Sequence, residues 1–104
     1  MIAAIPASEN RIEAETGDRF ARCPYFCFYN TDTGDIEFRE NDMRDASEGV
    51  GPQVVEFLAK NGINEVYASE VGPKALSLLN KLNIKTTIIK PRLTVKQVIN
   101  MLNN

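Results

Sequence analysis

Two Gly-Pro pairs, Gly51-Pro52 and Gly72-Pro73, are the residues of this chain whose spacing best suits binding chemistry. Proline is favoured at the first position of a helix, so each pair predicts a helix start. The N–H groups of a first helical turn have no partner within the helix, and the macrodipole adds positive potential there. A glycine at this point lets an anionic group approach the backbone closely. The two convergent helix starts lead to the hypothesis of an anion site, and the alternative is that the Gly-Pro pairs do no more than start the helices.

Two arginines, Arg19 and Arg22, lie in the polar segment ahead of an aromatic run. A guanidinium group can make two parallel hydrogen bonds to a carboxylate or a phosphate. Solvation at the surface is the alternative role for either side chain. The acidic residues Asp42, Asp45 and Glu48 lack both the spacing and the glycine of an EF-hand calcium site, so we interpret them as part of a solvated loop.

The chain contains no histidine, which removes the usual acid or base near neutral pH and the commonest metal ligand. Catalysis by Ser-His or Cys-His pairs and metal binding through histidine are therefore excluded. The two cysteines, Cys23 and Cys27, lie four residues apart in the aromatic run, which predicts a strand. Four strand residues span about 13 Å, whereas a disulfide needs Cα atoms within about 7 Å. We expect two reduced thiols and a location in the cytoplasm.

The hydrophobic share of 43% and the charged share of 25% are those of a folded domain, and 104 residues suffice for one domain. The net charge of −2 conceals an asymmetry: residues 1–52 contain five Arg against eleven Asp and Glu, and residues 53–104 contain seven Lys and Arg against three Glu. The sequence pI near 5.1, without a dense basic run, argues against nucleic-acid binding. No apolar run approaches the ~20 residues of a membrane span, and residues 1–6 lack the features of a signal peptide. We expect neither nucleic acid nor membrane among the partners.

Hydrophobic patterning predicts five strands and three helices in one domain. The apolar run at residues 2–6 does not alternate with polar residues, which favours a central strand buried on both faces. Gly34 lies in a short connection between two strand-like runs and predicts an antiparallel hairpin. Helical spacing behind Pro52, Pro73 and Thr94 predicts the helices. The predicted strands lie near residues 2–6, 24–30, 35–40, 65–69 and 85–89, and the predicted helices near 52–61, 73–82 and 94–103.

The order of these elements determines where a ligand would bind. Helical crossovers join parallel strands and place helices on both faces of a sheet. The predicted α/β architecture therefore has three layers around a five-stranded mixed sheet in the order 3-2-1-4-5, with the second strand antiparallel. Ligands of open α/β sheets bind beyond the carboxyl ends where the strand order reverses, here between the first and fourth strands. We expect the ligand site there, formed by Arg22, Gly51, Pro52, Ser69, Gly72 and Pro73.

Six short segments form a combination that is more specific than any one of them. They are Ile2-Ala3-Ala4-Ile5-Pro6, Phe20-Ala21-Arg22-Cys23-Pro24-Tyr25-Phe26, Asp32-Thr33-Gly34, Glu40-Asn41, Gly49-Val50-Gly51-Pro52 and Gly72-Pro73-Lys74-Ala75-Leu76. In this combination the chain resembles the dinitrogenase iron-molybdenum cofactor biosynthesis family, in its NifX-like group with small stand-alone members. The resemblance covers nearly the whole chain and implies a single domain, residues 1–104, with a ribonuclease-H-like three-layer fold in the 3-2-1-4-5 order.

The resemblance also implies a function, because family members bind or carry the iron-molybdenum cofactor or its iron-sulfur precursors during nitrogenase maturation. It implies a non-catalytic accessory or carrier protein and not an enzyme. The implied cofactor is an iron-molybdenum or iron-sulfur cluster, while another anionic small molecule fits the residues that depart from the family pattern as well. With such a cluster, Cys23 is the predicted soft metal ligand near the site.

Three departures from the family pattern keep a second hypothesis open. Arg19 stands where members commonly have a histidine, Ala21 stands where they have a glycine, and Met43 lies near the place of a further missing histidine. With these residues, a protein-interaction domain without a ligand is the alternative to a carrier. A nuclease of the ribonuclease H type is not supported, because the first strand offers no carboxylate to begin a two-metal site.

Overall fold

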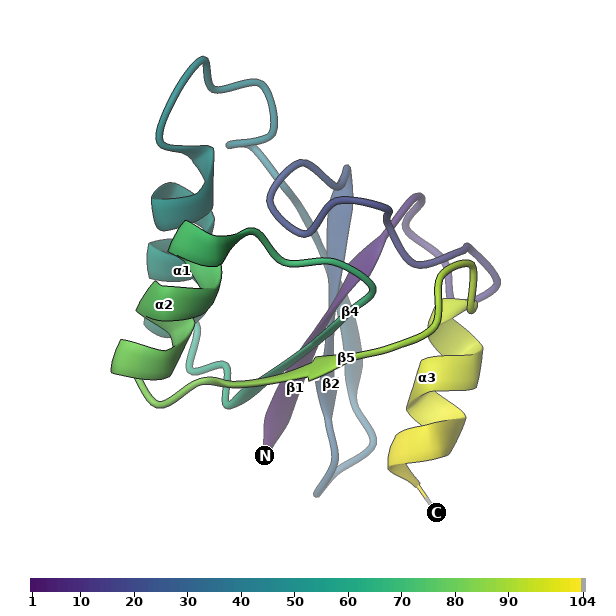
Figure 1. Ribbon diagram of the computed structural model, residues 1–104. Coiled ribbons are helices and arrows are strands. Elements are labelled where there is room, and N and C mark those ends of the chain that lie inside the picture. The colour runs from purple at the N-terminus through teal and green to yellow at the C-terminus, as the bar shows by residue number, and fades with distance from the viewer. Residues whose placement is uncertain (104) are drawn as a thin grey trace.

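In residues 1–103, five strands and three helices follow one another in the order expected from the sequence (Figure 1). The elements are β1 (Ile2–Ala7), β2 (Tyr25–Asn30), β3 (Ile36–Glu40), α1 (Val50–Lys60), β4 (Glu65–Ala68), α2 (Pro73–Lys81), β5 (Lys85–Ile88) and α3 (Val95–Leu102). The computed structural model describes residues 1–103. The strands form one sheet in the order β3-β2-β1-β4-β5, in which β2 runs antiparallel to both of its neighbours and β1, β4 and β5 are parallel. This confirms the predicted α/β fold and strand order.

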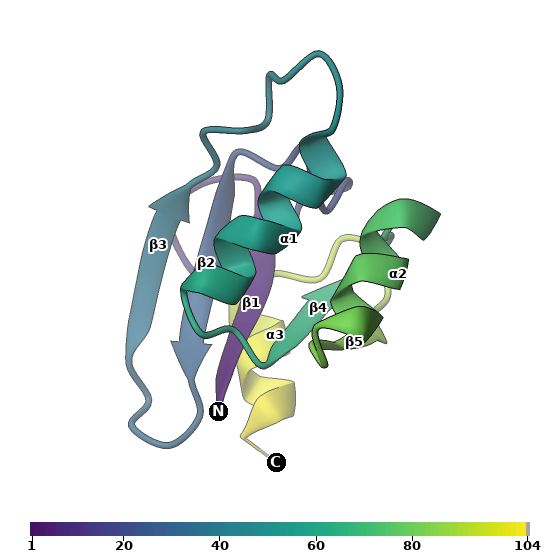
Figure 2. The same cartoon turned by 90° about the vertical axis from the view of Figure 1, so that its left-hand side faces the viewer.

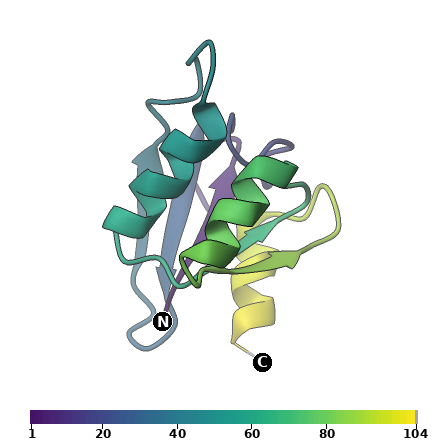
Figure 3. The same cartoon turned by 60° about the vertical axis from the view of Figure 1, so that its left-hand side comes forward.

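Two helices cover one face of the sheet and one helix covers the other (Figure 2). α1 and α2 lie side by side, with their starts at the same end of the sheet (Figure 3), over a core that includes Phe26 and Leu79. α3 covers the opposite face, over a second core that includes Ile5 and Val98. Residues 3–7 of β1 are buried between the two layers, which explains why their sequence does not alternate. In residues 1–103 no helix has the length and apolar character needed to cross a membrane.

The start of α1 departs from the prediction. The sequence predicts Pro52 at the first helical position, but α1 begins at Val50 and Pro52 occupies the third position. Gly49 is the N-cap in the left-handed conformation, with a φ of 68°, which glycine adopts without strain. The carbonyl of Gly49 accepts a 3.1 Å hydrogen bond from the N–H of Gln53. Proline is tolerated at the third position because the N–H it lacks would have no helical partner there. In α2, Pro73 is the first residue, as predicted.

The long connection between β1 and β2 is fastened to the start of α3. The N–H of Thr16 donates to the carbonyl of Leu93 at 2.8 Å, and the N–H of Val95 donates to the carbonyl of Ala14 at 2.9 Å. The sequence predicts this connection as a loop with a fragment of structure, and the fragment consists of single bridges to β1 and to residue 94. The following residues, 19–23, are thereby held at the carboxyl end of β1.

Candidate functional site

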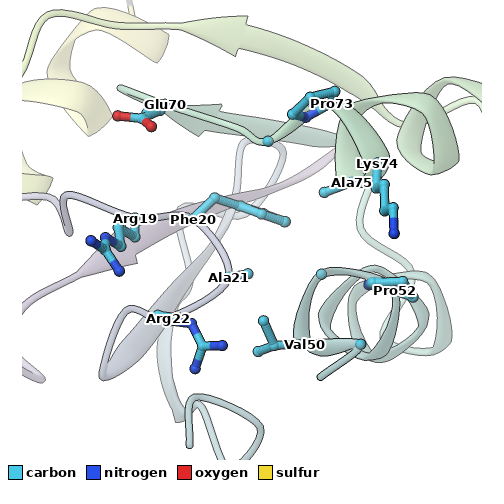
Figure 4. A pocket seen from close by; sticks show the side chains of 13 residues that line it. Arg19, Phe20, Ala21, Arg22, Val50, Pro52, Glu70, Pro73, Lys74 and Ala75 are labelled. Atoms are coloured by element: carbon cyan, nitrogen blue, oxygen red, sulfur yellow. The ribbon is translucent and has the colours of Figure 1, made fainter. Parts of the chain in front are cut away.

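A groove of about 550 Å³ lies at the carboxyl ends of β1 and β4 (Figure 4). Three segments form it: the loop at residues 19–22, the start of α1 and the start of α2. The predicted topology requires this convergence, because both helices begin where parallel strands end. The lining residues are Arg19, Phe20, Ala21, Arg22, Gly49, Val50, Gly51, Pro52, Glu70, Gly72, Pro73, Lys74 and Ala75.

Neither helix that opens into the groove has a side-chain cap. The N-caps of α1 and α2 are Gly49 and Gly72, and neither first turn contains an acidic residue. Among residues 1–103, no side chain caps either helix start. α3 begins away from the groove and has a complete capping box, in which the Thr94 hydroxyl accepts from the N–H of Gln97 at 3.1 Å. Helix geometry leaves the first-turn N–H groups without partners. At α1 and α2 the residues that carry these donors line the groove.

The two helix starts approach each other closely at Gly51 and Ala75. A Cβ atom built on Gly51 would lie 3.5 Å from the Cβ of Ala75, which is ordinary side-chain contact. Since prolines have no N–H, the first-turn donors are those of Val50 and Gly51 in α1 and of Lys74 and Ala75 in α2. Four donors from two helices, with the positive ends of both macrodipoles, thus converge on one space.

The charged side chains of the groove are three cations and one carboxylate, a formal charge of +2 among its described lining residues. Arg22 lies beside the start of α1 and Lys74 lies at the start of α2, while Glu70 directs its carboxylate away from Lys74 (Figure 4). Arg19, the third cation, lies in the same loop as Arg22. The uncharged side chains that line the groove are apolar: Phe20, Ala21, Val50, Pro52, Pro73 and Ala75, beside three glycines, Gly49, Gly51 and Gly72. The groove combines positive charge and N–H donors with apolar surface.

Buried side chains contact the loop that contains Arg19 and Arg22 and fix its backbone. Phe20 is 2% exposed and packs edge-on against Phe26, with the ring centroids 5.7 Å apart. The amide nitrogen of Asn41, a residue with no exposed surface, donates to the carbonyls of Ala21 and Cys23 at 2.9 Å each. The loop therefore has a fixed backbone although its arginine side chains are exposed.

The structure places Cys23 in the core and not at the groove surface. Its side chain is 2% exposed and its Sγ donates to the carbonyl of Phe20 at 3.3 Å. Burial raises the pKa of the Cys23 thiol to about 12, and burial likewise raises the pKa of Cys27 to about 12. Both cysteines are free thiols in separate cores, Cys23 under α1 and α2 and Cys27 under α3. A protonated, buried thiol is a poor metal ligand, so this position disfavours the predicted role of Cys23.

The groove brings together most of the predicted site residues. Arg22 and both Gly-Pro pairs line it, whereas Ser69 is half-buried at the end of β4 and its neighbour Glu70 lines the groove in its place. Sequence reasoning missed Lys74 and gave Asn41 no role. Lys74 could have been found from its position directly behind a predicted helix start. Asn41 gave no comparable signal, because its role depends on contacts with residues 18 and 20 positions earlier in the chain.

Other proteins share this fold or part of this sequence. A solved structure of the apo form of the orange protein of Desulfovibrio gigas is 28% identical, with a TM-score of 0.90, and the match covers 95% of this chain and 83% of that one. A Thermotoga protein assigned to the DUF35 family is 35% identical, with a TM-score of 0.82 and coverage of 95% and 84%. An uncharacterised protein of Methanocaldococcus jannaschii is 32% identical over 84 residues, which are 78% of this chain and 68% of the relative.

A protein-family model covers the whole chain. The model described as "Dinitrogenase iron-molybdenum cofactor" matches residues 1–104, which confirms the family that the sequence segments resemble. The description links this family to the iron-molybdenum cofactor of dinitrogenase. On the strength of the full-length match, this chain belongs to the dinitrogenase iron-molybdenum cofactor family.

Proposed function

We propose that this protein is a non-catalytic accessory or carrier protein that binds an anionic ligand in the groove at the starts of α1 and α2. One observation carries the proposal: the two helices that open into the groove lack side-chain caps, while α3, which begins elsewhere, has a complete capping box. Arg19, Arg22 and Lys74 line the same groove and give it positive charge. An anion would satisfy the N–H groups and the charges together.

The ligand class includes negatively charged metal–sulfur clusters, in keeping with the family. Within residues 1–103, no group of three or more His, Cys, Asp or Glu side chains could hold a metal ion, and Cys23 is buried. The side chains of the groove supply positive charge, N–H donors and apolar contacts. A cluster carried here would therefore keep its own sulfur or oxygen ligands, which would accept hydrogen bonds from the protein. The protein would bind such a cluster as cargo.

A carrier fits the groove chemistry better than an enzyme does. Two of its three cations are arginines, and a guanidinium group does not give up its proton near neutral pH. General acid–base catalysis needs a group whose pKa lies near the working pH. Fixed positive charge and fixed N–H donors instead favour binding and release. The family description, which names a cofactor, points in the same direction.

An anaerobic binding experiment tests this proposal. The protein is incubated with iron and sulfide, and separately titrated with molybdate and with phosphate, and uptake is followed by absorbance, metal analysis and calorimetry. Because a charge-assisted hydrogen bond contributes about 1.5–3 kcal/mol, Arg22→Ala should weaken binding roughly tenfold or more. Arg11→Ala is the matched control, since Arg11 is an exposed arginine that pairs with Glu9 and does not line the groove.

Two outcomes would contradict the proposal. Either none of these compounds binds, or Arg22→Ala binds them as tightly as the unchanged protein does. In both cases a protein-interaction domain without a ligand becomes the better hypothesis. Equal weakening by Arg11→Ala would show that affinity follows net charge and not the groove.

A further inference from the structure

The connection between β3 and α1 begins with a buried amide. Asn41 has no exposed surface, and its backbone N–H donates to the carbonyl of Pro24 at 2.9 Å. Its side-chain nitrogen donates to the carbonyls of Ala21 and Cys23, and its side-chain oxygen accepts from the N–H of Met43 at 3.1 Å. Both polar atoms of this side chain are therefore hydrogen-bonded. Two of these bonds reach the segment at residues 19–23, which contains Arg19 and Arg22.

The two carbonyls that Asn41 holds lie on either side of Arg22. The guanidinium of Arg22 is held by the same connection, because its Nη1 donates to the carbonyl of Arg44 at 2.8 Å. The side chain of Arg44 in turn donates to the carbonyl of Pro24 at 3.2 Å. One short turn, residues 41–44, thus fixes both the backbone and the charged end of Arg22.

We infer that Asn41 is a positioning residue for the ligand site, acting through the backbone of residues 21–23 to aim Arg22 at the groove. The expected effect on anion affinity rests on the proposed function, whereas the way in which Asn41 holds residues 21–23 rests on its hydrogen bonds. Without the amide, the part-buried carbonyl of Ala21 and the buried carbonyl of Cys23 lose this donor. The loop would then open to reach water, and Arg22 would have to be ordered anew on each binding event.

A ligand-free measurement tests the mechanism. Iodoacetamide alkylation of Cys23 and Cys27 is followed by peptide mass spectrometry, because Cys23 lies in the held loop and Cys27 lies in β2. In Asn41→Ala, Cys23 should react at least about tenfold faster through local opening, while Cys27 stays protected. Asn61→Ala is the matched control, since Asn61 also donates its side-chain amide to a backbone carbonyl, that of Phe57 at 2.8 Å, but at the end of α1.

A double-mutant cycle tests the consequence. With molybdate as the probe, Asn41→Ala should weaken binding about fivefold in the unchanged background and less than about twofold in the Arg22→Ala background, because coupled residues are not additive. Unchanged alkylation of Cys23 in Asn41→Ala would overturn the inference. So would equal effects on affinity in both backgrounds, which would indicate a general structural role.

The two proposals fail in different ways. If the unchanged protein binds no molybdate, phosphate or cluster, the proposed function fails, and Cys23 alkylation still decides whether Asn41 holds the loop. If Asn41→Ala does not fold, Asn41→Ser replaces it in both measurements. A serine hydroxyl has one hydrogen to donate, so it can serve only one of the two carbonyls. Cys23 should then be alkylated faster than in the unchanged protein, but by less than about tenfold. A rate equal to that of the unchanged protein would overturn the inference.

Discussion

The Nη1 atom of Arg22 donates a 2.8 Å hydrogen bond to the carbonyl oxygen of Arg44, which ties the groove to the connection between β3 and α1. The acceptor is a neutral backbone group, so this contact orients the guanidinium without compensating its charge. The Nη2 atom of Arg44 lies 3.9 Å from Oε1 of Glu40, and its Nε atom lies 4.0 Å from Oδ2 of Asp45. Arg44 is thus the cation beside these two carboxylates, and the contact that Arg22 makes leaves its positive charge available to the groove.

Gly17→Ala should destabilise the protein by about 1–3 kcal/mol, because overpacking a close contact forces the backbone to shift. A Cβ atom at Gly17 would lie 2.7 Å from the Cβ of Cys23. The free energy of unfolding is measured in urea, with Gly51→Ala as the control. At Gly51 the added Cβ makes ordinary contact within a helix, so stability should be unchanged or rise by up to about 1 kcal/mol. If Gly17→Ala were as stable as the unchanged protein, the segments around Gly17 and Cys23 could move apart at no cost, which would contradict this prediction.

Glu70→Gln should strengthen the binding of molybdate or phosphate about two- to fivefold at low salt. The substitution removes the carboxylate among the described lining residues and raises the formal charge of the groove from +2 to +3. The effect should shrink at 0.5 M salt because exposed charges are screened. Glu56→Gln, which removes a carboxylate paired with Lys60 at 2.9 Å outside the groove, should change affinity little. Weaker anion binding by Glu70→Gln would mean that Glu70 orders a cation of the site.

Cys23→Ala should leave ligand uptake within about twofold of the unchanged protein and cost about 1 kcal/mol of stability through the lost buried sulfur. The reason is the position of the thiol in the core, 2% exposed and hydrogen-bonded to the carbonyl of Phe20. Iron and sulfide content after anaerobic reconstitution measures uptake. Loss of cluster uptake with intact binding of phosphate would instead establish Cys23 as a metal ligand.

Stability should fall as the pH rises above about 9. Burial raises the pKa of Cys23 and of Cys27 from the ordinary value of 9.0 to about 12. The folded state thus binds these two protons more tightly than the unfolded chain does. Their contribution to the free energy of unfolding is therefore complete below pH 9 and is lost between pH 9 and pH 12. Each thiol should contribute a slope of about 1 kcal/mol per pH unit in this window.

Urea unfolding at pH 8, 9.5 and 10.5 measures this dependence. The variant Cys27→Ala serves as the comparison and should show a shallower decline, because one of the two raised thiols is gone. A free energy of unfolding that stays constant from pH 8 to pH 10.5 would contradict the burial of both thiols.

The sequence predicts the fold far better than it predicts the details of the groove. The unalternating run of β1, the glycine of the hairpin and the Pro73 helix start are local signals, and each has the predicted structural outcome. Pro52 misled the prediction because the left-handed Gly49 begins α1 earlier than proline preference suggests. The hydrogen bonds of Asn41 and the burial of the Cys23 side chain could not be predicted. Both depend on contacts between segments that only the folded sheet brings together.

An NMR titration of the ¹⁵N-labelled protein with molybdate tests the central claim most directly. The claim is that the uncapped starts of α1 and α2 hold the anion, so the amide signals of Gly51, Lys74 and Ala75 should shift most and should saturate together. The first-turn amides of α3, at Lys96 and Gln97, serve as the internal control, and their signals should stay in place. The N–H of Lys96 already donates to the carbonyl of Ile12 at 2.8 Å, and the N–H of Gln97 already donates to the Thr94 hydroxyl at 3.1 Å. Saturable shifts centred on α3, or no saturable shifts at the starts of α1 and α2, would contradict the account.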